Sequence, residues 1–142
     1  MSNTSNEQSA EYFFGNVIST YTRAQAIEDC VLIDPGDIVK EAGIVWPVAL
    51  TAGAWADCVA WTDADSEHQV YQDQSGRLWD VIYMASHAIR TCKRQTNALS
   101  FQLYRVPRDG KSTESALATL KLIVGPGDAG EPVITMLLPH ED

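Results

Sequence analysis

Residues 75–94, SGRLWDVIYMASHAIRTCKR, are the longest stretch of the chain with an unbroken helical apolar period, and they constrain the fold most. Their apolar residues recur at alternating steps of four and three, which places them on one face of an α-helix. This face consists of Leu78, Ile82, Ala85, Ile89 and Cys92. We therefore predict a long central helix that needs an apolar surface to pack against.

Three short runs after this helix have the composition of β-strands and supply such a surface. They cover residues 99–106, 118–124 and 133–138. The two gaps between them hold turn residues, at 107–110 and 125–130. Connections this short favour an antiparallel meander, so we expect these strands to pair with one another in sequence order.

The first half of the chain shows shorter helical patterns. Thr22 and Gln25 form a capping box that predicts a helix over residues 23–29. Thr51 is the expected N-cap of a helix that reaches residue 61. A short helix over residues 37–42 is expected to end at Gly43, a residue that readily adopts a left-handed conformation.

Three segments in this half have no helical period. Residues 30–34 are predicted to form a β-run, which Pro35 ends. Residues 44–50 contain Pro47 and are interpreted as an extended connection. The acidic segment around residues 63–73 is interpreted as a solvated loop.

Together these patterns predict an α+β fold. We expect a two-layer domain in which the N-terminal helices and the long central helix pack on a C-terminal antiparallel β-meander of three or four strands. Residues 1–11 have almost nothing to bury and are predicted to be a disordered tail. Residues 12–142 are then a single domain, because their number is ordinary for one domain.

The composition is that of a globular protein, with 45% hydrophobic and 20% charged residues. No apolar run approaches the roughly 20 residues that span a bilayer. The first residues also lack the basic and then apolar order of a signal peptide. We therefore expect a cytoplasmic protein that does not bind membranes.

The chain is acidic, with 19 acidic and 10 basic residues and a net charge of −9. This charge repels phosphates and disfavours direct binding of nucleic acid. It either serves solubility or mimics a nucleic acid towards a basic partner, and the second reading predicts an acidic binding surface. Its candidate residues are Asp63, Asp65, Glu67, Asp73 and Asp80.

Cysteines and histidines are few and scattered, without the spacing of a disulfide framework or a metal site. They are Cys30, Cys58, Cys92, His68, His87 and His140. The carboxylates near residue 65 also lack the glycine and the distal glutamate of a calcium-binding EF-hand loop. We therefore expect neither a metal nor a cofactor.

One enzymatic alternative stays open. Basic and phenolic side chains surround the predicted sheet, and helices followed by such a sheet are the broad plan of small metal-free ribonucleases of toxin type. Those enzymes need cations at the cleaved phosphate and a general acid or base nearby. The candidate residues are Tyr104, Arg105, Arg108, Lys121 and His140.

Four tryptophans lie within a short part of the chain, at Trp46, Trp55, Trp61 and Trp79. Three of them are expected to complete the core, because a large aromatic ring gains most from burial. One left exposed is a natural hot spot for binding another protein.

Four blocks of sequence are distinctive in combination. They are VISTYTRAQAIEDCVLID at residues 17–34, SGRLWDVIYMASHAIR at 75–90, YRVPRDG at 104–110 and LKLIVGPGDAGEPVITMLLPHED at 120–142. They resemble a family of small uncharacterised proteins encoded on bacterial plasmids, conjugative elements and phages. The chain departs from that family's pattern at Cys30, where the resemblance implies a glycine after the first helix.

The resemblance implies a gene that lies among conjugation, replication and anti-restriction functions, and it supplies no catalytic residue. We therefore predict a non-enzymatic accessory protein of a mobile genetic element that acts by protein–protein binding. Its partner is expected to be a host or phage protein, including one with a basic nucleic-acid-binding surface. Inhibition of a host defence system, by anti-CRISPR or anti-restriction action, is the expected role.

Overall fold

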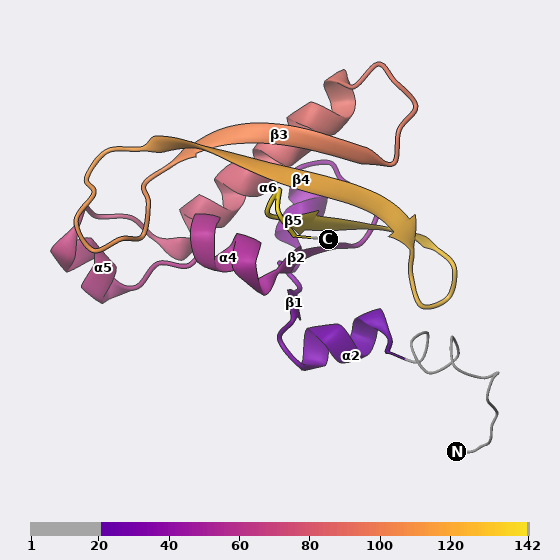
Figure 1. The fold of residues 1–142 in the computed structure, drawn as a ribbon, viewed down its shortest axis with the longest axis horizontal. Helices are drawn as coiled ribbons and strands as arrows, with labels where there is room; N and C mark the ends of the chain where they lie inside the picture. The colour runs from indigo at the N-terminus through magenta and orange to yellow at the C-terminus, as the bar shows by residue number, and fades with distance from the viewer. Residues whose placement is uncertain (1–20, 142) are drawn as a thin grey trace.

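A five-stranded, mostly antiparallel sheet organises the α+β fold (Figure 1). The structure is a computed structural model that describes residues 21–141, so the predicted tail at residues 1–11 lies outside the described residues. The strands are β1 (Leu32–Ile33), β2 (Val48–Thr51), β3 (Ala98–Arg105), β4 (Ala116–Pro126) and β5 (Pro132–Leu137). The helices are α2 (Arg23–Glu28), α3 (Ile38–Glu41), α4 (Ala52–Cys58), α5 (Asp63–His68) and α6 (Gln74–Thr91).

The strand order is β1-β2-β5-β4-β3. Strands β3, β4 and β5 pair antiparallel in succession, as predicted. The predicted meander is nevertheless only part of the sheet, because β2 pairs parallel to β5 and β1 pairs antiparallel to β2. Two strands from the N-terminal half thus extend a sheet that the sequence patterns place entirely in the C-terminal half.

The interpretation of residues 44–50 as an extended connection was therefore wrong for its last residues. Pro47 lies just before β2, where its carbonyl accepts a hydrogen bond of 2.8 Å from the Ile134 amide. Proline is tolerated there because it needs to donate nothing to the ladder. The four-residue strand pairs with β1 over two residues and with distant β5 over three, and this pairing leaves no signal in the local pattern.

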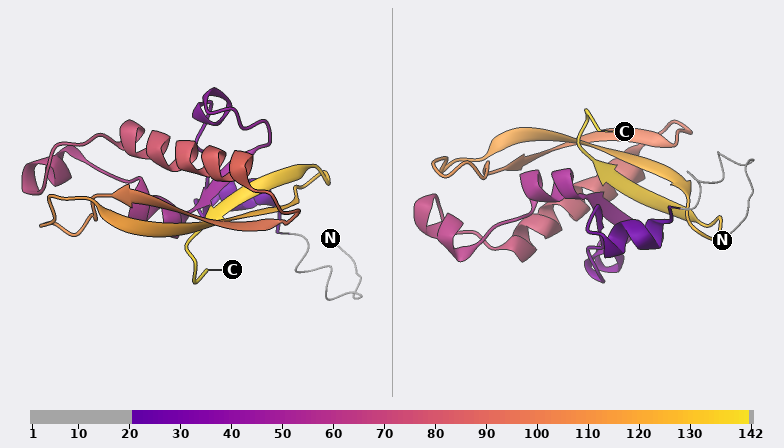
Figure 2. Two further views of the ribbon diagram at one scale, coloured as in Figure 1. Left: turned by 90° about the horizontal axis from the view of Figure 1, so that it is seen from above. Right: turned by 60° about the horizontal axis from the view of Figure 1, so that its bottom comes forward.

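Helix α6 packs on the sheet through the face that its periodicity predicts (Figure 2). Leu78, Ile82 and Ala85 are buried there, in one cluster with side chains of β3, β4 and β5. Each large apolar side chain in this cluster contributes about 1.5–3 kcal/mol by its burial. The face weakens at its C-terminal end, since Ile89 is 36% exposed and Cys92 lies beyond the helix. Among the described residues no helix is long and apolar enough to cross a membrane.

The predicted helix starts are confirmed at Thr22 and Thr51. The Thr22 hydroxyl accepts from the Gln25 amide at 3.0 Å, and the Gln25 side chain accepts from the Thr22 amide at 2.9 Å. The Thr51 hydroxyl accepts from the Ala54 amide at 3.1 Å and thereby caps α4. Each cap satisfies backbone donors that have no partner inside the helix.

The predicted solvated loop at residues 63–73 is instead partly helical, because α5 forms there. None of the residues of α5 is buried, so its sequence has no apolar period from which a helix could be predicted. A capping box formed by Thr62 and Asp65 starts the helix, and Asp63 and Asp65 place negative charge in its first turn. Carboxylates at this end interact favourably with the helix dipole.

The turn after α2 is left-handed at a residue that is not glycine. Cys30 has a φ of 62°, directly after the C-cap residue Asp29. A side chain at such a φ is strained, since its Cβ lies close to a backbone carbonyl. The structure therefore has, at Cys30, the backbone geometry for which the family resemblance implies a glycine.

The prediction that three tryptophans complete the core was wrong. Trp61 is buried, with 4% of its surface exposed, and Trp55 is partly buried. Trp46 and Trp79 are 43% and 37% exposed. Two large aromatic side chains are therefore left on the surface. One of them, Trp79, lies on the solvent-exposed side of helix α6.

Candidate functional site

A groove with a volume of about 400 Å³ lies between α6 and the edge strand β3. Its lining residues are Asp80, Tyr83 and Met84 from α6, Gln102, Leu103 and Tyr104 from β3, and Leu117 from β4. We call it the α6–β3 groove. Its walls come from three elements that the core holds together, α6, β3 and β4, so no loop contributes a wall.

Exposed aromatic side chains border this groove. Trp79 and Tyr83 lie one turn apart on α6, and their ring centroids are 6.0 Å from each other. Tyr83 is 47% exposed, and Tyr104, which projects from β3, is 68% exposed. Leu117 beside Tyr104 is 50% exposed. Large side chains grouped in this way on a surface are typical of a protein-binding site.

A smaller pocket of about 190 Å³ adjoins the groove and shares Asp80, Leu103 and Tyr104 with it. It also contains the guanidinium groups of Arg77 and Arg105. Arg105 pairs with Asp57 of α4 at 3.1 Å, while its buried Nε has no hydrogen-bond partner in the described part of the chain. This pocket is therefore polar where the groove is apolar.

Arg77 is buried although it has no ion pair within the described residues, and backbone carbonyls hold it in place. Its Nε donates to the Val59 carbonyl at 3.0 Å, and its Nη1 donates to the Val106 carbonyl at 2.9 Å. Burial lowers the pKa of Arg77 below its usual value. The second bond joins the start of α6 to the residue after β3, beside the smaller pocket.

Asp80 is the carboxylate of the groove. Its side chain makes no hydrogen bond or ion pair with any residue between 21 and 141. Burial raises the pKa of Asp80 above its usual value, and the positive charge of Arg77 partly offsets this. A carboxylate that is partly desolvated and has no partner favours a cation at this place.

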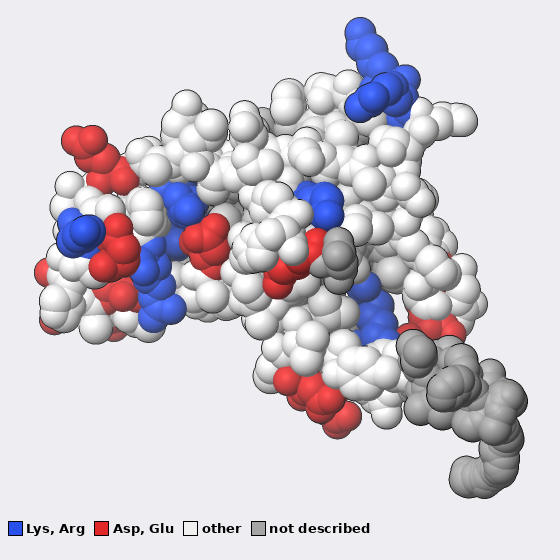
Figure 3. Space-filling view, in the orientation of Figure 1, with Lys and Arg blue, Asp and Glu red and all other residues white. Residues whose placement is uncertain are grey.

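The residues of the predicted acidic surface have different roles in the structure. Asp65 is part of the α5 cap and pairs with Arg108 at 2.8 Å, and Asp73 caps α6 by accepting from the Gly76 amide at 2.6 Å. Asp63 and Glu67 are exposed on α5, and Asp80 lies in the groove. Figure 3 shows acidic and basic side chains intermixed at the end of the molecule formed by α5 and the β3–β4 loop.

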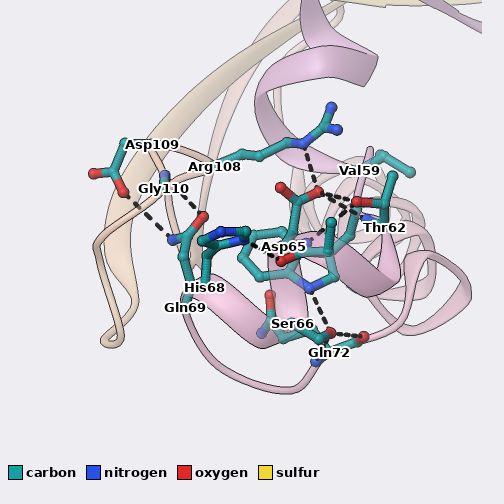
Figure 4. Close-up of polar contacts among 12 residues, drawn as sticks. Val59, Thr62, Asp65, Ser66, His68, Gln69, Gln72, Arg108, Asp109 and Gly110 are labelled. Atoms are coloured by element: carbon teal, nitrogen blue, oxygen red, sulfur yellow. Dashed lines mark hydrogen bonds and ion pairs between the residues drawn. The ribbon is translucent and has the colours of Figure 1, made fainter.

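A polar network fixes that end of the molecule (Figure 4). Gln69 Nε2 donates to the carbonyls of Pro107 and Ser112, each at 2.7 Å, and Gln69 Oε1 accepts from the Gly110 amide at 3.0 Å. Arg108 reaches from the same loop to Asp65. The network therefore holds the β3–β4 loop against α5, and the side chains of Gln69, Asp65 and Arg108 have a structural role in it.

The residues of the enzymatic alternative are dispersed. Tyr104 and Arg105 lie at the groove and its adjoining pocket, whereas Arg108 pairs with α5. Lys121 donates to the Glu141 carbonyl at 3.3 Å, and His140 is exposed near the C-terminal end. Lys121 and Tyr104 stand four positions apart along the strand pair, which is about 13 Å. The structure thus brings two of the five residues together.

Several groove residues were missed by sequence reasoning, namely Tyr83, Met84, Gln102 and Leu117. A signal existed for Tyr83, because Trp79 and Tyr83 recur at a step of four on α6 outside the face of Leu78 and Ile82. Large aromatic residues on the face of a helix that points away from the core indicate a partner. Within the described residues no group of three His, Cys, Asp or Glu side chains is placed to hold a metal ion.

Comparison with known proteins gives a family and no function. The profile of a family of unknown function (DUF6573) matches residues 10–142. No curated protein and no solved structure matches the chain.

Proposed function

Since the chain belongs to a family of unknown function, DUF6573, we propose its role from its geometry: it is a non-enzymatic accessory protein that acts by binding another protein. The observation that carries this proposal is the α6–β3 groove, which exposed Tyr83 and Tyr104 line, together with exposed Trp79 next to Tyr83. Tryptophan and tyrosine dominate the energetics of protein interfaces, because they bury a large area with few rotatable bonds.

The charge of the chain supports a basic partner. A net charge of −9 speeds the encounter with a positively charged surface and disfavours other acidic proteins. Together with the resemblance to proteins of plasmids, conjugative elements and phages, this favours a host or phage protein with a nucleic-acid-binding surface. The biological role that we propose is inhibition of a host defence, by anti-CRISPR or anti-restriction action.

An affinity pull-down from host lysate, identified by mass spectrometry, tests the proposal. The bait is the full chain as wild type and as the variants Trp79→Ala and Tyr104→Ala. Tyr71→Ala is the matched control, because Tyr71 is 80% exposed and does not line the groove. We expect the wild type and the Tyr71→Ala control to recover the same partner. We expect Trp79→Ala and Tyr104→Ala to lose it.

Salt separates charge from groove contacts. Exposed charges are screened beyond about 10 Å at 0.1 M salt, so recovery should weaken as salt is added. Equal recovery by the groove variants and the wild type would place the binding surface elsewhere. An empty pull-down, followed by RNA cleavage in vitro that Arg105→Ala abolishes, would replace this proposal by the ribonuclease alternative.

A further inference from the structure

We propose that the partner contributes an extended segment that pairs with the free edge of β3 as a sixth strand, with apolar side chains in the α6–β3 groove and a lysine or arginine against Asp80. This inference rests on the proposed function and specifies the kind of partner that the groove accepts. Four observations carry it: the backbone of β3, the composition of its edge, the groove and the unpaired carboxylate.

The backbone of β3 has one unpaired side. The register pairs Ala98 with Ile123, and the Val124 amide donates to the Asn97 carbonyl at 2.8 Å. In an antiparallel pair, hydrogen-bonded positions alternate with positions whose backbone groups point away from the partner strand. The residues that bond to β4 are therefore Leu99, Phe101, Leu103 and Arg105. The residues whose N–H and C=O groups point outward are Ala98, Ser100, Gln102 and Tyr104. The Thr96 hydroxyl bonds both groups of Ala98, at 3.2 Å and 2.9 Å, so the open part of the edge runs from Ser100 to Tyr104.

The composition of this edge leaves it open to pairing. Proteins protect edge strands by shortness, proline, bulges or charged side chains. The other edge strand, β1, has two residues, whereas β3 has eight. From Ala98 to Tyr104 the strand contains neither proline nor a charged residue. Such an edge is a ready template for another strand, and the described part of the chain does not cover it with one.

The groove explains how side chains are selected. In an added strand, alternate side chains point to the same side. Those on the side of α6 would lie beside Tyr83, Met84 and Leu103, which are apolar. Main-chain hydrogen bonds then provide affinity, and the pockets for alternate side chains provide specificity, as in other cases of strand addition.

Charge complementarity identifies the polar residue of the partner. Asp80 is the charged residue in the lining of the groove, and it has no partner among residues 21–141. Its charged neighbours in the adjoining pocket are Arg77, which backbone carbonyls hold, and Arg105, which pairs with Asp57. A strand with a lysine or arginine at one position that faces α6, and apolar residues at the other positions on that side, satisfies both the groove and this carboxylate.

A random library of displayed 12-residue peptides, selected on the full chain, tests the inference even while the natural partner is unidentified. We expect the selected peptides to have apolar residues at every second position, with one of these positions occupied by lysine or arginine in most peptides. Selection on Asp80→Lys should turn that position acidic, because the charge at this point is reversed. Enrichment that ignores the charge of residue 80 would overturn the role of Asp80.

Amide hydrogen exchange of the full chain, with and without a selected peptide, tests strand addition itself. The amides of Ser100, Gln102 and Tyr104 should exchange fast in the free protein and be protected at least tenfold by the peptide. The amides of Phe101 and Leu103, already bonded to β4, should be protected in both states. Slow exchange of the three outward amides in the free protein would mean that the edge is already filled, by a second copy or by the chain itself, and would overturn the inference.

A proline substitution provides the functional counterpart. Ser100→Pro removes an outward N–H and should weaken peptide binding at least tenfold, whereas Ser100→Ala keeps that N–H and should bind as the wild type does. Replacing alternate amide hydrogens of the peptide by methyl groups removes the bonds that the peptide donates to the outward carbonyls of β3, without changing the protein. A peptide or lysate partner whose binding needs Trp79 and Tyr104 but tolerates these changes would leave the proposed function standing and refute strand addition.

Discussion

The guanidinium of Arg77 lies over the ring of Trp61, with 4.6 Å between its central carbon and the ring centroid. The indole N–H of Trp61 donates to Ser66 of α5 at 3.0 Å. Through these two contacts the start of α6 is fixed to α5, and the bond from Arg77 to the Val106 carbonyl fixes it to the end of β3. Trp79 and the groove residue Asp80 follow directly, so we expect their position to depend on Arg77.

Arg77→Lys should therefore destabilise the protein strongly. A lysine cannot donate to the Val59 and Val106 carbonyls in the same geometry, and a buried acceptor left without a partner costs about 1–3 kcal/mol. We expect a loss of about 2–4 kcal/mol in the free energy of unfolding, measured by urea denaturation. Arg94→Lys, at an exposed position, is the control and should change it by less than about 0.5 kcal/mol. Equal effects would show that Arg77 has no special role.

Cys30→Gly should stabilise the protein. Glycine relieves the strain of the positive φ, about 1–2 kcal/mol, and this exceeds its cost in the unfolded chain. The expected net gain is about 0.5–1 kcal/mol, which is visible as a rise of Tm by about 2–4 °C. Cys30→Ala removes the thiol but keeps the Cβ, so it should give no such gain. If alanine and glycine act alike, backbone strain is not the cause.

Asp80→Asn should separate binding from stability. The folded protein holds the proton of Asp80 more tightly than the unfolded chain, because its folded pKa is raised. The stability from this group is thus present below the unfolded pKa and lost as pH rises through the folded pKa. Relative to wild type, Asp80→Asn should gain a few tenths of a kcal/mol between about pH 3 and pH 7, a small effect because solvent screens this side chain.

The same variant should lose peptide affinity at pH 7. A stability scan over pH, together with a binding titration, checks both parts. Loss of stability at neutral pH would indicate that Asp80 has a structural role and would contradict its assignment to binding.

Gln69→Glu should loosen the β3–β4 loop. The substitution replaces the side-chain amide that donates to Pro107 and Ser112 by a carboxylate that only accepts. We expect faster cleavage in limited proteolysis at residues 107–115 and a loss of about 1–2 kcal/mol in stability. Glu67→Gln, at an exposed position of α5, is the matched control and should leave the cleavage rate unchanged.

Local patterns predicted what depends on local chemistry. The capping box at Thr22, the helix cap at Thr51 and the buried face of α6 were all predicted from their spacing and are confirmed. Helix α5 was missed because it buries nothing, although Thr62 and Asp65 form a capping box at its start. Strand β2 was missed because it is short and its partners, above all β5, lie outside its own segment. A local signature joined to an apolar period was predicted, whereas a cap without such a period and strands defined by a distant partner were not.

The groove had the same limitation. Its residues come from α6, β3 and β4, and only the pairing register places Leu117 beside Tyr104. The acidic surface and the residues of the enzymatic alternative were predicted from residue type alone. Residue type does not reveal that Asp65 and Arg108 pair with each other. Of the acidic residues predicted to bind a partner, Asp80 is the one that lines the groove.

Calorimetric titration of the purified partner, or of the tightest selected peptide, into the full chain is the most direct test of the central claim. The account predicts that Trp79→Ala and Tyr104→Ala each weaken binding by about 2 kcal/mol or more, whereas Tyr71→Ala leaves it unchanged. All variants should keep the far-UV circular dichroism and the cooperative unfolding of the folded state. Equal affinity for wild type, Trp79→Ala and Tyr104→Ala would contradict the claim that this protein binds its partner through the α6–β3 groove.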